Sequence, residues 1–407
     1  MFGGGSSRWK SSSNNMGRQI LSNAHIVLPL RTIHGSVVIE DDRIADVSAI
    51  RHYGEGLDLG GQFLIPGVID IHTDYMEKEL NPRPSTNFPL AMAFHFMDVR
   101  AIACGLTTVL GAARISNEEE TQARISLWRG DGLALAKAYR ELSRTALARH
   151  LIHLRWNPNF EPVDHILPQL AELESIGNLV FNDAVPGERQ FRSANEERIQ
   201  AFAAREHLGI EEARIRWEER RDALRRVNTR SKVKAALGGR IPLGSHDDTT
   251  VEHVEEAHEA GATLSEMPCT IEAARRAKEL GMMVCMGAPN YFRGGSHCGN
   301  LSCVEAMGEG LVDILCSDFH FPSMLGSAIR MMQTGVEPPA AINMMTLNAA
   351  RYLRRDRELG SIEVGKKADL VAFSPRDSYA AVTHVWVDGA VRLQAGVNTQ
   401  APETCVV

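Results

Sequence analysis

The sequence predicts an α/β fold: a (β/α)8 TIM-like barrel with a small β-sandwich domain formed from both chain ends. Two observations lead to this prediction. Strand patterns with turn residues stand near both ends of the chain, and between them short apolar runs alternate with helical patterns. Such alternation is typical of parallel β/α units, whose strands are covered by helices.

The two ends of the chain have the pattern of antiparallel strands. Residues 35–47 hold two apolar runs around the polar pair Asp41-Asp42, which predicts a hairpin. Residues 359–373 hold two further strand-like runs, and residues 385–391 carry Asp388-Gly389, a favoured hairpin turn. These strands are expected to meet in one small domain.

The domain boundaries follow from these patterns. We expect residues 17–65 and 356–397 to form the small β domain, and residues 66–355 to form the barrel. Residues 1–16 are rich in Gly, Ser and Asn and lack the apolar run of a signal peptide, so a disordered tail is expected there.

The middle of the chain contains eight candidate strands, the number that a closed barrel requires. They are Val68–His72, Thr107–Leu110, Leu151–Arg155, Leu179–Asn182, Ile241–His246, Thr263–Glu266, Met283–Met286 and Val312–Asp318. A highly charged stretch, residues 188–237, stands between the fourth and fifth of these. Its apolar residues recur near helical spacing, which predicts amphipathic helices with a solvated face; a lid is the alternative. These apolar residues are Ile210, Ala213, Trp217, Leu224 and Val227.

Composition excludes several classes of function. The formal net charge is −7 and neither half of the chain is strongly basic, so a general nucleic-acid binder is not expected. No apolar run reaches 18 residues, so no membrane span is expected. The seven cysteines are odd in number and scattered, as in a reduced cytoplasmic protein. The composition does not exclude a pocket for a phosphorylated small molecule.

Polar residues follow the predicted barrel strands, where barrel enzymes carry their sites. His72 ends the first strand and Asp74 stands two residues later, His246 ends the fifth, and Asp318 ends the eighth. Imidazole and carboxylate are zinc ligands, so we predict a metal site from these four residues. The metal makes hydroxide available near neutral pH, with Asp318 as the base and His246 as a second candidate catalytic residue. Other strand ends carry His153, Arg155, Asn182, Asp183 and Glu266.

A second group of residues is suited to anions. Arginine offers a planar fork that matches phosphate, and the Gly294-Gly295 step lets backbone N–H groups approach an anion. The candidate substrate-binding residues are Arg83, Arg155, Arg189, Arg293 and His297. A GxSxG elbow, a phosphate-binding P-loop and a GxGxxG turn after a strand are absent from the sequence, which disfavours acyl-serine and nucleotide-loop chemistry.

Several stretches resemble a known family. The motif at residues 64–72 (LIPGVIDIH) and the motif at residues 365–371 (GKKADLV) resemble the amidohydrolase superfamily. More narrowly, the chain is similar to the α-D-ribose 1-methylphosphonate 5-triphosphate diphosphatases of the carbon–phosphorus lyase pathway. The stretches that carry this are HTDYMEKELNPRP (72–84), GLTTVL (105–110), HLR (153–155), PGERQF (186–191), SHDDTT (245–250), MGAPNYFRGGSHCGN (286–300) and SDF (317–319).

The resemblance implies a hydrolase that releases pyrophosphate from a ribose 5-triphosphate with a phosphonate at C1. It implies that His72, Asp74, His246 and Asp318 bind the metal, and that Arg83, Arg189 and Arg293 hold anionic groups. Superfamily membership also implies a homo-oligomer, expected to be a dimer.

The chain departs from the family pattern at three positions. Asn157, Ala184 and Met97 stand where a glutamate, a histidine and a histidine are expected. The first two replacements remove ligands of a second metal, so we predict a mononuclear or rebuilt site, with zinc and one ion per chain favoured over two. The alternative activity is hydrolysis of a C–N bond, by a deaminase or cyclic amide hydrolase with one metal. A barrel without activity is the third reading, against which the retained metal residues argue. Cys269, Cys298 and Cys316 stay open as replacement ligands, although free cysteines are commonly buried.

Overall fold

The computed structural model describes residues 17–50, 56–83, 86–115, 132–159, 166–183, 189, 195–296 and 298–396. The expected tail, residues 1–16, lies outside these residues. Within them, no helix is both long and apolar enough to cross a membrane.

The predicted barrel is confirmed as an eight-stranded parallel sheet in which strand order follows chain order. Its strands are β6 (Val68–Thr73), β7 (Leu106–Ile115), β8 (Arg149–Trp156), β9 (Ile176–Phe181), β10 (Leu243–His246), β11 (Leu264–Glu266), β12 (Met283–Gly287) and β13 (Ile314–Cys316). Each coincides with one of the eight predicted strands. The first and last strands approach each other through a single bridge between Thr73 and Asp318, so the barrel is nearly closed.

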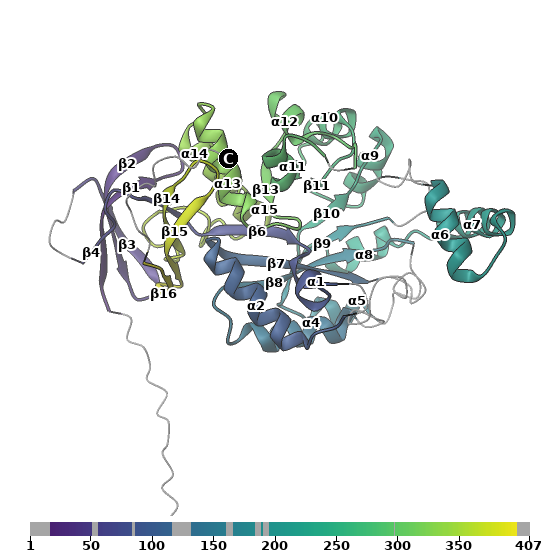
Figure 1. Ribbon diagram of the computed structural model, residues 1–407, viewed down its shortest axis with the longest axis horizontal. Helices are drawn as coiled ribbons and strands as arrows, with labels where there is room; N and C mark the ends of the chain where they lie inside the picture. Colours follow the sequence, from purple (N-terminus) through teal and green to yellow (C-terminus); the bar gives the residue numbers. More distant parts are fainter. Residues whose placement is uncertain are drawn as a thin grey trace, which may run out of the picture.

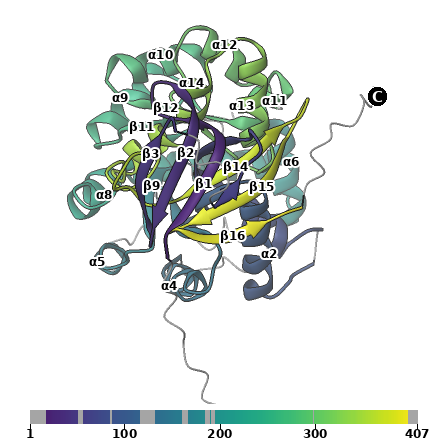
Figure 2. The ribbon, with the colours of Figure 1, turned by 90° about the vertical axis from the view of Figure 1, so that its left-hand side faces the viewer.

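The second sheet is built from both ends of the chain, as predicted, and Figure 2 looks onto it with the barrel behind. Its hydrogen-bonded order is β16-β15-β14-β5-β1-β2-β3, and β4 pairs with β1. The strands are β1 (Gln19–Val27), β2 (Thr32–Glu40), β3 (Arg43–Ser48), β4 (Leu57–Asp58), β5 (Phe63–Pro66), β14 (Leu370–Pro375), β15 (Ala380–Val387) and β16 (Ala390–Gln394).

Both predicted hairpins are present. Strands β2 and β3 are antiparallel and meet at Glu40 and Arg43, and β15 and β16 meet across Asp388-Gly389. Both residues of that turn have positive φ, of 49° and 73°, as a tight hairpin turn requires. The first strand-like run of residues 359–373 is not a strand: Gly360 and Gly365 both take positive φ and turn the chain, and only β14 joins the sheet.

The passage from the small sheet into the barrel depends on Gly67, which lies between β5 and β6. A Cβ at Gly67 would stand 2.0 Å from Oγ1 of Thr107, so only glycine lets β6 pack this closely against β7. This junction places His72, at the far end of β6, at the carboxyl end of the barrel.

Helices surround the barrel and are linked to its strands in the expected alternation (Figure 1). They are α1 (Tyr75–Leu80), α2 (Leu90–Ala103), α4 (Gly132–Ser143), α5 (Leu167–Ala171), α6 (Asn195–Glu206), α7 (Ile210–Arg225), α8 (Arg230–Leu237), α9 (Val251–Glu259), α10 (Ile271–Glu279), α11 (Ala288–Arg293), α12 (Cys303–Gly308), α13 (Ser323–Gln333), α14 (Pro338–Asn343) and α15 (Leu347–Tyr352).

The charged segment forms the helices α6, α7 and α8, and α6 and α7 stand out at one side of the molecule in Figure 1. Ala213 and Trp217 pack in a separate small apolar cluster with Ile199 and Phe202, so their predicted inward face is confirmed. For Ile210, at the start of α7, the predicted inward position is wrong, because 42% of this residue is exposed.

Candidate functional site

Polar side chains from five barrel strands meet at the carboxyl end of the barrel. The register places His246 of β10 beside Glu266 of β11. The bridge between Thr73 and Asp318 brings the end of β6 next to the residues that follow β13. His153 and Arg155, on β8, complete the cluster from the third strand.

The seam between the first and last strands fixes Asp318. The backbone N–H of Asp318 donates to the carbonyl of His72 (3.1 Å), and the N–H of Asp74 donates to the carbonyl of Asp318 (2.6 Å). Beneath it, buried Asp70 accepts hydrogen bonds from the N–H (2.9 Å) and hydroxyl (2.5 Å) of Ser317. Asp318 has a φ of 54°, a strained conformation for a non-glycine residue that these bonds maintain.

We call His72, Asp74 and Asp318 the outer group, since their ligand atoms all lie within 4.8 Å of one another. Arg155 Nη2 lies 3.2 Å from Asp74 Oδ1 and also contacts His72 Nε2. Burial opposes the charge of Asp74, yet Arg155 and His72 hold the pKa of this carboxyl well below its usual value. Burial raises the pKa of Asp318, an effect that His72 opposes and Asp74 reinforces. Asp318 is therefore the better proton acceptor of these two carboxylates.

We call His72, His153 and Glu266 the inner group; their ligand atoms also lie within 4.8 Å of one another, and all three residues are buried. Glu266 Oε1 lies 3.0 Å from His72 Nδ1, and Oε2 lies 3.4 Å from His153 Nε2. His246 Nε2 lies 3.8 Å from the same Oε2. Burial opposes the charge of Glu266, yet the histidines hold its pKa well below its usual value. Burial lowers the pKa of His153 to about 3, although Glu266 opposes this.

The donor atoms of the inner group are not satisfied by protein hydrogen bonds. The buried atoms that have no hydrogen-bond partner among the described residues include His72 Nδ1, His153 Nε2, His246 Nε2 and both carboxylate oxygens of Glu266. Buried polar atoms nearly always have a partner, so this concentration needs an explanation. Imidazole nitrogen and carboxylate oxygen are the ligand types that Zn²⁺ accepts, and these residues fit a divalent metal.

A pocket of about 300 Å³ opens onto this cluster. Asp74, Arg155, His246 and Asp318 line its floor, so three of the four predicted metal residues and one predicted anion-binding arginine face it. The remaining predicted metal residue, His72, is buried beneath them. The segment after β12, which includes the end of α11, also lines the pocket, through Asn290, Arg293, Ser296, Cys298 and Asn300. The pocket thus joins the candidate metal donors to two arginines.

Arg189, another predicted anion-binding residue, does not line this pocket. Its guanidinium is buried and contacts Asp248 (2.5 Å) and Asp183, and it donates to the backbone carbonyl of His246 (3.2 Å). Burial opposes its charge, but the two carboxylates raise the pKa of Arg189 above its usual value. Arg189 therefore supports the backbone of His246 instead of lining the pocket.

The other predicted residues lie apart from the pocket or outside the described residues. Arg83 is exposed beyond α1, and its backbone N–H donates to Thr86 Oγ1 (3.2 Å). His297 and Ala184 lie outside the described residues. Cys269 and Cys316 are buried and do not line the pocket, whereas Cys298 does.

The remaining departures from the family pattern have different surroundings. Asn157 is buried just after β8 and accepts a hydrogen bond from the N–H of Asn159 (3.0 Å). Met97 is buried in the main hydrophobic core on α2, near Tyr139. Met97 is therefore part of the packing around the barrel rather than of the pocket.

The sequence did not single out His153 and Glu266 as candidate ligands. Both were recognised only as polar residues near strand ends. The signal that could have identified Glu266 is the register of neighbouring strands: Ser245-His246 and Ser265-Glu266 end β10 and β11 with the same polar pattern.

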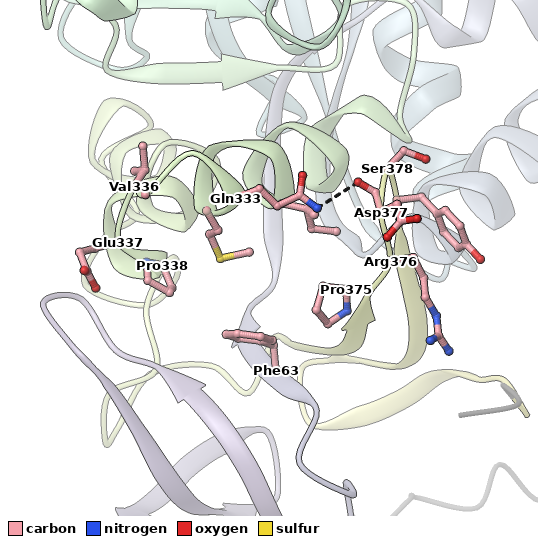
Figure 3. Close-up of a pocket in the computed structure, with 13 residues that line it drawn as sticks. Phe63, Gln333, Val336, Glu337, Pro338, Pro375, Arg376, Asp377 and Ser378 are labelled. Carbon is pink, nitrogen blue, oxygen red and sulfur yellow. Dashed lines mark hydrogen bonds between the residues drawn. The ribbon is translucent and has the colours of Figure 1, made fainter. Parts of the chain in front are cut away.

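A larger cavity, of about 870 Å³, lies between α13, α14 and the β14–β15 turn. Phe63, Val336, Pro338 and Pro375 line it, and Gln333 Nε2 donates to the carbonyl of Asp377 (3.1 Å; Figure 3). No group of potential metal ligands among the described residues lies there. The chemistry is therefore expected in the smaller pocket.

Comparisons with known proteins agree with this arrangement. A model of the amidohydrolase family matches residues 223–393. The chain is 32% identical over 381 residues to the α-D-ribose 1-methylphosphonate 5-triphosphate diphosphatase of Escherichia coli (strain K12), covering 91% of this chain and 99% of the relative. It is 22% identical over 424 residues to an imidazolonepropionase of Geobacillus sp. (strain WCH70), covering 92% and 90%.

Solved structures show the same fold at low sequence identity. N-acetylglucosamine-6-phosphate deacetylase from Pasteurella multocida superposes with a TM-score of 0.60 at 14% identity, covering 91% of this chain and 98% of that one. Dihydropyrimidinase from Brevibacillus agri superposes with a TM-score of 0.61 at 14% identity, covering 93% and 95%.

Proposed function

Because the chain belongs to the amidohydrolase family, we propose that this hydrolase cleaves the triphosphate of a ribose 5-triphosphate that carries a phosphonate at C1. The products would be the 5-phosphate and pyrophosphate. The observation that supports this most is the pocket that combines metal donors with Arg155 and Arg293, in a chain similar over its length to such a diphosphatase.

Two arginines of the pocket are suited to binding the phosphate groups of the substrate. Arg155 on β8 and Arg293 at the end of α11 both line the pocket, so both can contact phosphate oxygens. Arginine suits this role because its planar fork matches phosphate oxygens. Their contacts would hold the phosphate chain with the bond between the α- and β-phosphates near Asp318. Arg83 does not line this pocket and stays a predicted anion-binding residue, as does His297, which lies outside the described residues.

Asp318 would serve as the base. Water attacks the α-phosphorus, and the bond between the α- and β-phosphates breaks with pyrophosphate as the leaving group. The proton of the water passes to the Asp318 carboxylate. Asp318 lines the pocket, and the seam through Ser317 and Asp70 holds it in place. A base whose pKa is raised accepts a proton more readily near neutral pH.

The donors available to a divalent metal are the predicted residues His72, Asp74, His246 and Asp318, and also His153 and Glu266. When bound, such a metal lowers the pKa of water and offsets the negative charge that develops on phosphate. Zinc suits these ligand types. His246 lines the pocket, and its Nε2 lies 3.8 Å from Glu266 Oε2, so it connects the pocket with the inner group.

The test is release of pyrophosphate from the ribose triphosphate by metal-loaded protein. The proposal expects turnover in the unmodified protein and a loss of about 100-fold or more in kcat in Asp318→Asn, in line with a general-base role. Metal content of the variant is measured alongside, because Asp318 is also a proposed ligand. Turnover that is unchanged in Asp318→Asn would reject its role.

The second candidate is hydrolysis of a C–N bond in a cyclic amide or amino-substituted ring. It is favoured by the similarity to imidazolonepropionase and by a shorter match, 32% identical over 151 residues, to an adenine deaminase of Clostridium botulinum. Release of ammonia or appearance of a carboxylate from such compounds, with no pyrophosphate from the triphosphate, would favour it. Arg293→Ala separates the two, since loss of that arginine weakens binding strongly only for a polyanionic substrate.

A further inference from the structure

The inner group contains a contact that protein atoms alone leave unfavourable. His153 Nδ1 lies 3.0 Å from the carbonyl oxygen of Ile71 and is hydrogen-bonded to it. A carbonyl oxygen only accepts, so Nδ1 carries the proton. In the neutral ring, Nε2 then presents a lone pair, and this lone pair faces Glu266 Oε2 at 3.4 Å.

Two acceptors that face each other in a buried site need a cation between them. His153 and Glu266 are both 0% exposed, so water does not screen the contact. Among the described residues, no lysine or arginine makes an ion pair with Glu266; its charged neighbours are histidines. His72 offsets part of the charge of this buried carboxylate, but the lone pair of His153 still faces Glu266 Oε2, and a divalent ion would satisfy both acceptors.

The outer group differs because it already contains a cation. Arg155 Nη2 lies 3.2 Å and 3.4 Å from the two carboxylate oxygens of Asp74. A metal that entered the outer group first would have to compete with this guanidinium. In the inner group this guanidinium contacts only His72, through Nε2, and it makes no ion pair with Glu266 among the described residues.

We propose that His153 and Glu266, together with His72, form the seat of the first divalent metal ion in this chain. The proposal rests on the metal dependence in the proposed function and specifies the ligands. It also provides a rebuilt site for a chain that has Asn157 and Ala184 at the positions of the expected ligands. His72 belongs to both groups, and His246 lies between Glu266 and the pocket, so the inner seat adjoins the site of hydrolysis.

The experiment titrates chelator-treated full-length protein with Co²⁺ and follows the visible d–d absorption up to one equivalent. Glu266→Gln and His153→Gln should raise the dissociation constant for the first equivalent more than about 100-fold, which exceeds the loss typical of residues that only orient a ligand. Both should also change the absorption bands. Asp74→Asn is the matched control from the outer group: its first equivalent should bind within about tenfold of the unmodified protein, with unchanged bands.

Thermal unfolding supplies a second readout that separates a ligand from a structural carboxylate. One equivalent of Co²⁺ should raise the unfolding temperature of the unmodified protein and of Asp74→Asn above that of their metal-free forms, and should leave Glu266→Gln near its metal-free value. A carboxylate that only holds the histidines in place would leave this metal-induced rise intact in Glu266→Gln.

The proposal is overturned if Asp74→Asn loses the first equivalent while Glu266→Gln and His153→Gln keep it with unchanged bands. It is equally overturned if one equivalent of Co²⁺ raises the unfolding temperature of Glu266→Gln as much as that of the unmodified protein. These readouts do not use turnover, so failure to cleave the triphosphate would reject the proposed function and leave the assignment of the seat intact.

Discussion

Replacement of Arg189 tests whether this arginine braces the protein or binds substrate. Its guanidinium is buried with a side-chain exposure of 2%, and it is the cation that pairs with Asp248, which is itself 0% exposed. Arg189→Met keeps the length of the side chain but removes the charge. Asp183 retains a second partner, Arg230, at 2.5 Å, so the unpaired charge would fall on Asp248.

The magnitude follows from that unpaired carboxylate. Removing one partner of a buried ion pair typically costs about 3–5 kcal/mol, because a charge is left in a poorly solvated place. Hydroxyls of Ser245 (2.7 Å) and Ser265 (3.2 Å) still donate to Asp248 and keep the loss of unfolding free energy near the lower value, about 3 kcal/mol. Urea unfolding followed by circular dichroism measures it through the shift in midpoint.

A double variant identifies the cause. Arg189→Met with Asp248→Asn removes the stranded charge, so it should be at least about 1 kcal/mol more stable than Arg189→Met alone, as expected for coupled neighbours. An Arg189→Met variant that unfolds at the same urea concentration as the unmodified protein, and instead raises KM with kcat unchanged, would contradict a structural role for Arg189. That outcome would assign Arg189 to substrate binding, as the sequence predicts.

The remaining predictions concern the pocket, the metal and acid stability. Arg293→Ala should raise KM for the triphosphate by tenfold or more with little change in kcat, because a charged hydrogen bond to phosphate is worth about 1.5–3 kcal/mol; equal KM values in a steady-state assay would contradict its role. A chelator followed by desalting should abolish turnover, and added Zn²⁺ should restore it; turnover that survives metal removal, checked by elemental analysis, would contradict a metal-dependent hydrolase. Asp98 is buried and accepts from the N–H groups of Leu147 (2.7 Å) and Ala148 (2.9 Å). Burial opposes the charge of Asp98, but His150 and these N–H groups lower its pKa, so its stabilisation is present above the ordinary carboxyl pKa and is lost as pH falls toward the lowered value. The urea midpoint of Asp98→Asn should therefore fall less steeply between pH 5 and pH 3 than that of the unmodified protein, and parallel curves would contradict this.

Much of the fold was predictable because it follows from local patterns. Apolar runs, helical periodicity and the turn pair Asp388-Gly389 identified the barrel strands and the terminal hairpin. The first strand-like run of residues 359–373 failed since Gly360 and Gly365 turn the backbone, and apolar character alone does not distinguish a strand from a buried turn.

The site was only partly predictable because its geometry depends on contacts between distant strands. Strand ends indicated His72, Asp74, His246 and Asp318 as polar residues on one face, and three of them line the pocket. The sequence could not show that Arg189 pairs with Asp183 and Asp248, because an arginine in a loop has the same pattern whether it faces a ligand or a buried carboxylate.

Other features needed the three-dimensional packing. The contact of His153 with Glu266 depends on strand register and on the hydrogen bond from His153 to the Ile71 carbonyl. Met97 stands where the family pattern expects a histidine, but its place in the core becomes clear only when α2 packs on the barrel.

Hydrolysis of a triphosphate in the pocket at the carboxyl end of the barrel is the proposed activity. Its most direct test is ³¹P NMR of the ribose 5-triphosphate, with its phosphonate at C1, incubated with metal-loaded protein. We expect the triphosphate signals to be replaced by those of one phosphomonoester and pyrophosphate, with the phosphonate signal retained. Triphosphate signals that persist at full metal loading, or release of inorganic phosphate in place of pyrophosphate, would contradict it.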